Sequence, residues 1–103
     1  MAGLGPCPFA GQMLADLGAT VIKIENPRDP DYTRSFPPMV DVDGGQTSAF
    51  FAQFNRNKLG VSLDLRSEDG KALFLKLVRK ADVVVENFRP GVMDKLGVGY
   101  ETL

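Results

Sequence analysis

Residues 83–85 form an uninterrupted valine run between Asp82 and Glu86. β-Branched residues favour strands because their stiff side chains pack well on a pleated surface. Successive side chains of a strand point to opposite faces, so an all-apolar strand has to be covered on both sides, as in a parallel sheet. The run therefore predicts a buried parallel strand over residues 82–86.

Two more strands and four helices are predicted from the spacing of apolar residues. Residues 20–25 are β-branched and residues 60–65 alternate between apolar and polar, and both patterns indicate strands. Helical spacing and capping residues, with Ser67 and either Thr47 or Ser48 as N-caps, predict helices in segments 9–18, 47–54, 67–80 and 92–96. This order is typical of an α/β fold with a doubly wound, Rossmann-like parallel sheet.

Such a sheet would be incomplete. The first predicted element is a helix with no strand before it, and the chain ends soon after Leu96. We therefore expect residues 1–103 to be one partial domain, truncated at both ends and of marginal stability alone, because small domains bury too little surface. Residues 26–45 are rich in proline and glycine and are expected to form a long irregular loop, a kind of segment that is often functional.

The composition excludes several classes of protein. With 44% hydrophobic and 24% charged residues, the chain has the composition of a folded protein, and its net charge of −1 argues against nucleic-acid binding. The lack of histidine and the single cysteine, Cys7, exclude a Cys/His metal site, a His-based triad and an internal disulfide. No apolar run reaches the roughly 20 residues that span a bilayer, and the N-terminus lacks a basic region. We therefore expect a cytoplasmic protein without a membrane partner.

Polar and aromatic residues follow each predicted strand. Asn26 follows the first strand, Arg66 the second, and Asn87, Phe88 and Arg89 the third. In open α/β sheets ligands bind beyond the carboxyl ends of the strands. Guanidinium groups bind phosphate in a bidentate manner, and a purine stacks on an aromatic or guanidinium plane. The set suits a phosphorylated adenine nucleotide, although each residue also has an ordinary role as a solvated, turn-stabilising or core side chain.

Four segments carry a more specific pattern. Residues 5–25 contain GPCPFAGQMLADLGA followed by VIKIE, residues 31–34 read DYTR, residues 55–58 read NRNK before VSLDL, and residues 81–100 contain ADVVVENFRPG. Together they resemble the family III CoA-transferases, the group of formyl-CoA transferase and the carnitine CoA-transferases. The resemblance runs in order over essentially the whole chain.

This resemblance implies transfer of coenzyme A from an acyl-CoA to a free carboxylic acid, with no metal. The family uses an aspartate nucleophile, a form of covalent catalysis. That aspartate lies downstream of the stretch matching Tyr100, so the chain is expected to contain no catalytic residue and to be inactive alone. Family members form interlocked homodimers, and we expect the same of the full-length protein.

The resemblance also implies which residues contact coenzyme A. By motif match these are Leu63, Arg66, Asn87, Phe88, Arg89 and Lys95. Gly5 and Pro6 match positions near the thioester, and Asn26 stands where some members have a nucleotide-contacting arginine. Two other readings stay open: a piece of an α-methylacyl-CoA racemase, whose catalytic histidine would lie beyond Leu103, and a non-catalytic nucleotide-binding module.

Overall fold

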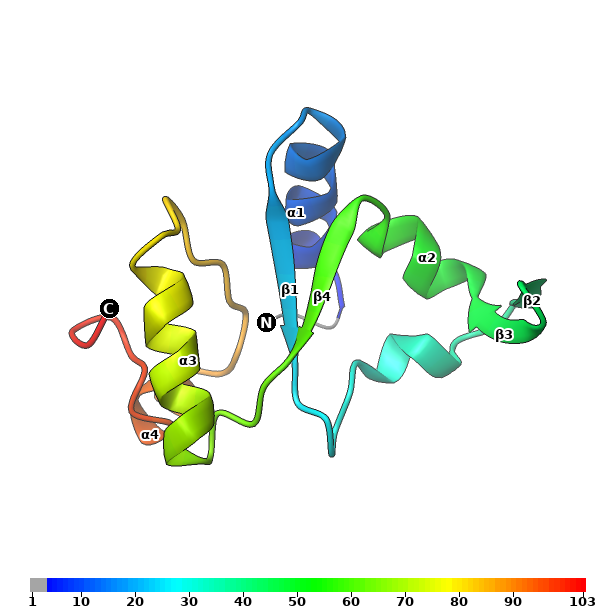
Figure 1. Ribbon diagram of the computed structural model, residues 1–103. Helices are drawn as coiled ribbons and strands as arrows, with labels where there is room; N and C mark the ends of the chain where they lie inside the picture. The colour runs from blue at the N-terminus through cyan, green and yellow to red at the C-terminus, as the bar shows by residue number, and fades with distance from the viewer. Residues whose placement is uncertain (1–3) are drawn as a thin grey trace.

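The computed structural model describes residues 4–103 and contains helices arranged around a short parallel sheet (Figure 1). The elements are α1 (Pro6–Asp16), β1 (Val21–Glu25), the 3-10 helix η1 (Tyr32–Ser35), β2 (Met39–Val42), β3 (Gly45–Ser48), α2 (Ala49–Asn55), β4 (Lys58–Ser62), α3 (Glu68–Val78) and α4 (Val92–Lys95). The chain is thus an α/β domain, as predicted.

Strands β1 and β4 pair in parallel, from Val21 opposite Lys58 to Glu25 opposite Ser62. Both strands were predicted, although β4 begins and ends earlier than the predicted segment 60–65. The pairing extends one step further, because the Leu63 N–H donates to the Glu25 carbonyl oxygen over 2.9 Å. The carboxyl ends of both strands therefore meet at one edge of the sheet.

The predicted third strand is wrong. Residues 82–86 have no strand partner among the described residues, and the sheet of β1 and β4 has two strands only. Val83 is 70% exposed, and Val84 and Val85 are 36% and 38% exposed. An apolar composition suits a buried strand, but strand formation also needs a neighbouring backbone with free N–H and carbonyl groups. Nothing in residues 4–103 supplies that neighbour, so the segment has no regular secondary structure.

The predicted irregular loop 26–45 also needs correction. It contains η1 and, at its end, the antiparallel hairpin of β2 and β3, in which Met39 faces Ser48. The hairpin turn is Asp43-Gly44, with positive φ angles of 49° and 80°. An Asp-Gly pair is a strong signal for a two-residue hairpin turn, because both central residues need positive φ. The sequence therefore carries a local signal for the hairpin, which the loop prediction did not use.

Capping residues set the starts of the helices. The Ser48 and Ser67 hydroxyls accept hydrogen bonds from Phe51 N and Gly70 N over 3.1 and 3.0 Å, which confirms both serines as N-caps. Helix α1 begins at Pro6, three residues before the predicted start. Proline suits the first turn of a helix because its φ is already helical and no N–H is needed there.

The core is small and lies under α3 and α4. Leu65, Phe74, Met93 and Val98 are buried, with Ile24, Leu63, Val78 and Leu96 packed against them. A second apolar cluster is aromatic: neighbouring rings of Phe9, Phe54, Phe50, Phe36 and Tyr32 lie 4.9–6.3 Å apart between centroids. It joins α1 to α2 and η1.

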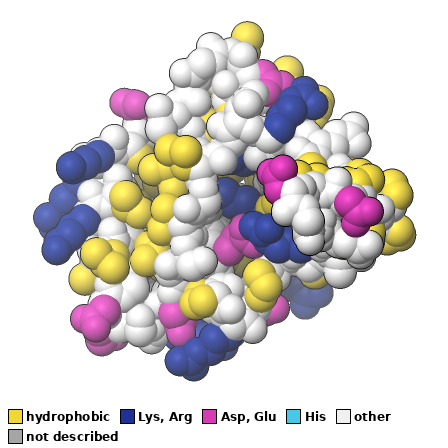
Figure 2. Space-filling view, turned by 45° about the vertical axis from the view of Figure 1, so that its right-hand side comes forward, with side chains coloured by type: hydrophobic (Ala, Val, Ile, Leu, Met, Phe, Trp, Pro, Cys, Tyr) yellow, Lys and Arg dark blue, Asp and Glu magenta, His cyan; other side chains and the backbone are white. Residues whose placement is uncertain are grey.

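Much apolar surface stays open. Leu17 is 83% exposed and Tyr100 is 90% exposed. On the face drawn in Figure 2, hydrophobic side chains reach the surface in groups rather than singly. Contiguous apolar patches on a soluble domain normally mark surfaces that contact other protein. The marginal stability expected of the chain alone stays a prediction.

Candidate functional site

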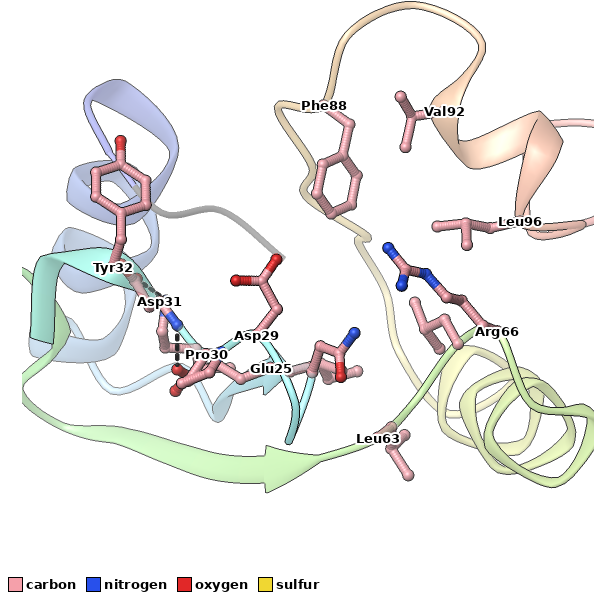
Figure 3. A pocket seen from close by; sticks show the side chains of 14 residues that line it. Glu25, Asp29, Pro30, Asp31, Tyr32, Leu63, Arg66, Phe88, Val92 and Leu96 are labelled. Carbon is pink, nitrogen blue, oxygen red and sulfur yellow. Dashed lines mark hydrogen bonds and ion pairs between the residues drawn. The ribbon is translucent and has the colours of Figure 1, made fainter.

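A cavity of about 320 Å³ opens beyond the carboxyl ends of β1 and β4. One wall is the end of β1 and the segment that follows it, as far as Tyr32. The opposite wall consists of the residues after β4, Phe88 and two apolar residues in and beside α4, Val92 and Leu96. Segments far apart in the sequence thus meet around one space (Figure 3).

Arg66 and Phe88 dominate the wall beyond β4. Arg66 follows an Asp64 turn, in which the Arg66 N–H donates to Asp64 Oδ1 over 3.0 Å. The Arg66 guanidinium has no hydrogen-bonding or ionic partner among residues 4–103, and Phe88 is 42% exposed. Figure 3 shows both side chains bordering the open space, with Leu96 beside Arg66, and Leu63 is a further apolar lining residue. This wall therefore presents a free cation and an aromatic face.

A buried ion pair shapes the opposite wall. Lys23 Nζ lies 2.7 Å from Asp31 Oδ2, and the two side chains are only 8% and 2% exposed. The other carboxylate oxygen of Asp31 accepts bonds from Thr33 N over 2.9 Å and Thr33 Oγ1 over 2.6 Å. Buried charges are tolerated when they are paired and their remaining lone pairs are satisfied, as here. The pair fixes the start of η1 against β1.

Glu25 and Arg34 form a second link between β1 and η1. The Arg34 guanidinium donates through Nη2 to Glu25 Oε1 over 2.6 Å and through Nε to Glu25 Oε2 over 3.0 Å. The Asp31 N–H also donates to Glu25 Oε2. These hydrogen bonds, that from Arg34 above all, lower the pKa of Glu25, although partial burial opposes the effect. Arg34 in turn lies 3.9 Å from the centroid of the Phe51 ring.

The segment between these two links carries Asp29. Its turn is closed by a bond from Asp29 N to the Asn26 carbonyl oxygen over 3.2 Å and by one from Arg28 N to Asn26 Oδ1 over 2.9 Å. Figure 3 shows the Asp29 carboxylate directed into the cavity, on the side opposite Arg66. Sequence reasoning missed Asp29, Asp31 and Tyr32 as lining residues, because their position depends on how the loop folds back.

Comparison with known proteins identifies the family of this chain. Residues 1–103 match the model of CoA-transferase family III. The chain belongs to CoA-transferase family III.

Two relatives in family III share about half of their aligned residues with this chain. The acetyl-CoA:oxalate CoA-transferase of Acetobacter aceti is 51% identical over 96 residues, which cover 93% of this chain and 24% of that protein. The succinate–glutarate CoA-transferase of Agrobacterium fabrum is 48% identical over 99 residues, covering 93% of this chain and 25% of that protein. The chain thus spans about a quarter of the length of these curated relatives.

Solved structures agree with the family III assignment. A CAIB/BAIF family protein from Brucella suis matches with a TM-score of 0.86 and 44% identity, over 98% of this chain and 28% of that one. Rv3272 from Mycobacterium tuberculosis matches with a TM-score of 0.80 and 39% identity, over 98% of this chain and 28% of that one. The likeness therefore covers the described fold but only part of each neighbour.

The six residues that family III resemblance assigns to coenzyme A do not all lie together. Leu63, Arg66 and Phe88 line the cavity, whereas Asn87, Arg89 and Lys95 do not. Asn87 Nδ2 instead donates to the Leu4 carbonyl oxygen over 3.1 Å, which ties the segment after the valines to the start of the described chain. Arg89 and Lys95 are exposed on the turn and helix beside the cavity.

No cluster of three or more potential metal ligands occurs in the described part of this family III chain. Among residues 4–103, no helix has the length and apolar character that crossing a membrane requires.

Lys58 is a basic residue that lies away from the cavity. Its Nζ donates to the carbonyl oxygens of Pro8 and Phe54 and to Asn55 Oδ1 over 2.8–3.1 Å. Lys58 therefore joins α1, α2 and β4 and does not face the cavity.

Proposed function

We propose that this chain forms the nucleotide-binding part of a family III CoA-transferase that moves coenzyme A from an acyl-CoA to a carboxylic acid. The observation that carries the proposal is the convergence of Arg66 and Phe88 on one cavity at the carboxyl edge of the sheet. The curated relatives from Acetobacter and Agrobacterium are CoA-transferases, which supports this reaction class over a racemase.

The cavity chemistry suits the nucleotide half of coenzyme A. A free guanidinium forms bidentate, charge-assisted hydrogen bonds with phosphate oxygens. An aromatic face stacks on a purine, and such stacking contributes about 1–3 kcal/mol per base. Leu63 and Leu96 add apolar surface that the adenine ring would cover. Arg66 would therefore hold a phosphate while Phe88 holds the base.

The proposed transfer of coenzyme A would use an aspartate outside this chain. In the reaction that the resemblance implies, an aspartate carboxylate attacks the thioester carbonyl and the coenzyme A thiolate leaves, which forms a mixed anhydride. The thiolate then attacks the anhydride carbonyl carbon that belongs to the aspartate. This step releases the first acid and leaves coenzyme A bound to the enzyme as a thioester. The acceptor carboxylate then attacks the enzyme thioester, which forms a second mixed anhydride and releases the thiolate. The thiolate attacks the acceptor's carbonyl carbon, which yields the new acyl-CoA and frees the aspartate. The homodimer and the cytoplasmic location expected from the sequence belong to this same proposal.

The binding role is tested on the chain itself by titration with coenzyme A, followed by the backbone amide signals in NMR. We expect weak binding, with shifts at Leu63, Arg66 and Phe88, and little effect of pantetheine, which lacks the nucleotide. Arg66→Gln should weaken binding about tenfold, whereas Arg79→Gln, which removes an exposed charge at the end of α3, should not. If coenzyme A leaves the signals around the cavity unchanged, the proposed function is wrong.

A further inference from the structure

We propose that Asp29 determines the specificity and orientation of the nucleotide, by accepting a hydrogen bond from a neutral donor of adenosine. The inferred donor is the adenine amino group or a ribose hydroxyl. The role of Asp29 rests on the proposed function, since it requires coenzyme A as the ligand of the cavity.

The cavity has charges of opposite sign on its two walls. The carboxylate of Asp29 and the guanidinium of Arg66 face the space from opposite sides, as Figure 3 shows. Neither group has a hydrogen-bonding or ionic partner among the described residues. The nearby cations are engaged elsewhere: Lys23 with Asp31, Arg34 with Glu25, and Arg28 within 3.9 Å of Asp64. Asp29 therefore presents an uncompensated negative charge to any ligand.

The loop holds Asp29 in a defined position. Its own N–H is bonded to the Asn26 carbonyl oxygen, and Pro30 follows it. The next residue, Asp31, is buried in the pair with Lys23 and is bonded through its N–H to Glu25. A side chain on a backbone anchored at both sides loses little freedom when it binds, and such preorganisation favours affinity. The same anchoring keeps the carboxylate directed into the cavity.

The opposed charges decide how a nucleotide lies. A phosphate beside the Asp29 carboxylate would be repelled, while a phosphate beside Arg66 would be attracted. The neutral donors of adenosine therefore belong on the Asp29 side. A hydrogen bond to an ionised acceptor is roughly twice as strong as a bond between neutral groups, so this contact discriminates ligands with a donor from ligands without one.

The experiment compares the affinity of coenzyme A for the native chain, for Asp29→Asn and for Asp43→Asn. Asn keeps the shape of Asp29 and removes its charge. Asp43→Asn removes the same charge at the β2–β3 turn, where positive φ suits asparagine. We expect Asp29→Asn to weaken coenzyme A binding about tenfold and Asp43→Asn to leave it unchanged. Pantetheine, without the nucleotide, should bind both variants alike.

Two results would overturn the assignment. Unchanged binding by Asp29→Asn means that the carboxylate makes no contact with the ligand that affects affinity, and tighter binding means that it only repels phosphate. A second ligand distinguishes the donor. In 1,N6-etheno-coenzyme A the adenine amino group is blocked, so loss of the Asp29→Asn effect with this ligand identifies the amino group, and persistence identifies a hydroxyl. Absence of coenzyme A binding by the native chain would instead refute the proposed function, and the role of Asp29 with it.

Discussion

Arg34 holds Glu25 through two nitrogen atoms, Nη2 at 2.6 Å from one carboxylate oxygen and Nε at 3.0 Å from the other. The pair joins η1 to the end of β1, and with the Lys23–Asp31 pair it keeps the intervening loop beside the cavity. Planar, bidentate geometry of this kind is specific to arginine and is not reproduced by lysine. The shape of one cavity wall therefore depends on two links from a single strand.

Glu25→Gln should loosen this wall. Glutamine keeps the size of the side chain but loses the charge that Arg34 and the Asp31 N–H share. We expect the free energy of unfolding to fall by about 1–2 kcal/mol, measured by urea denaturation. Lys71→Met, which removes the partner of the exposed Glu68 on α3, should cost less than about 0.5 kcal/mol. Equal costs for both variants would show that the link carries no special weight.

Stability should decline in acid because two carboxyl groups have lowered pKa values. The pKa of Asp16 falls from 3.8 to about 2, through hydrogen bonds from Arg56 first and then from Gln12 and Asn57. The pKa of Glu25 falls below 4.5, mainly through Arg34. In this range the unfolded chain binds more protons than the folded chain, so acid favours unfolding.

The urea midpoint should therefore be constant at pH values above the pKa values that these carboxyl groups have in the unfolded chain. It should fall between about pH 5 and about pH 2. The double variant Asp16→Asn, Glu25→Gln should start with a lower midpoint and show a weaker dependence on pH. A profile of the double variant parallel to that of the native chain would assign the acid sensitivity to other groups.

Gly70→Ala should be strongly destabilising. A Cβ at position 70 would overlap the backbone carbonyl oxygen of Asp64, which cannot move without disturbing the Ser67 cap. Overpacking against backbone costs about 1–3 kcal/mol, a large part of the stability of a small domain. Gly60→Ala in β4 is the matched control, since a methyl group at that position would meet no other atom within 4 Å. Thermal unfolding followed by circular dichroism measures both.

Val84→Asp should leave the folding of this chain nearly unchanged. The valine segment is unpaired and Val84 is 36% exposed, so the carboxylate at the end of an aspartate side chain can reach water, and the cost should be within about 1 kcal/mol. Phe74→Ala, in contrast, empties a core position that is 2% exposed and should cost about 3–5 kcal/mol. Loss of folding in Val84→Asp would mean that the segment is buried in solution, as the valine run predicted.

Local signals predicted most of the elements correctly. Ser67 caps α3 because its hydroxyl reaches Gly70 N, an interaction within one turn of the chain. The β-branched residues of β1 and the Asp-Gly turn of the hairpin are equally local signals, although the loop prediction did not use the second. The valine run led to a wrong prediction, because pairing depends on a partner that the composition of the run does not provide.

The candidate site also combines residues that the sequence predicted with residues whose roles depend on the folded chain. Arg66 and Phe88 were predicted from motifs and line the cavity, whereas the roles of Asp29 and Asp31 depend on links from Lys23 and Glu25 to a folded-back loop.

Family membership, the presence of β1 and β4 as strands, and the helix caps were determined by the sequence alone, because each rests on neighbours along the chain or on a motif. Only the tertiary structure decided that Asp29 faces Arg66 across one cavity and that residues 82–86 stay unpaired. The first depends on contacts between segments distant in sequence, and the second on the lack of a partner strand among the described residues. Such contacts form only where the folded backbone brings complementary groups together.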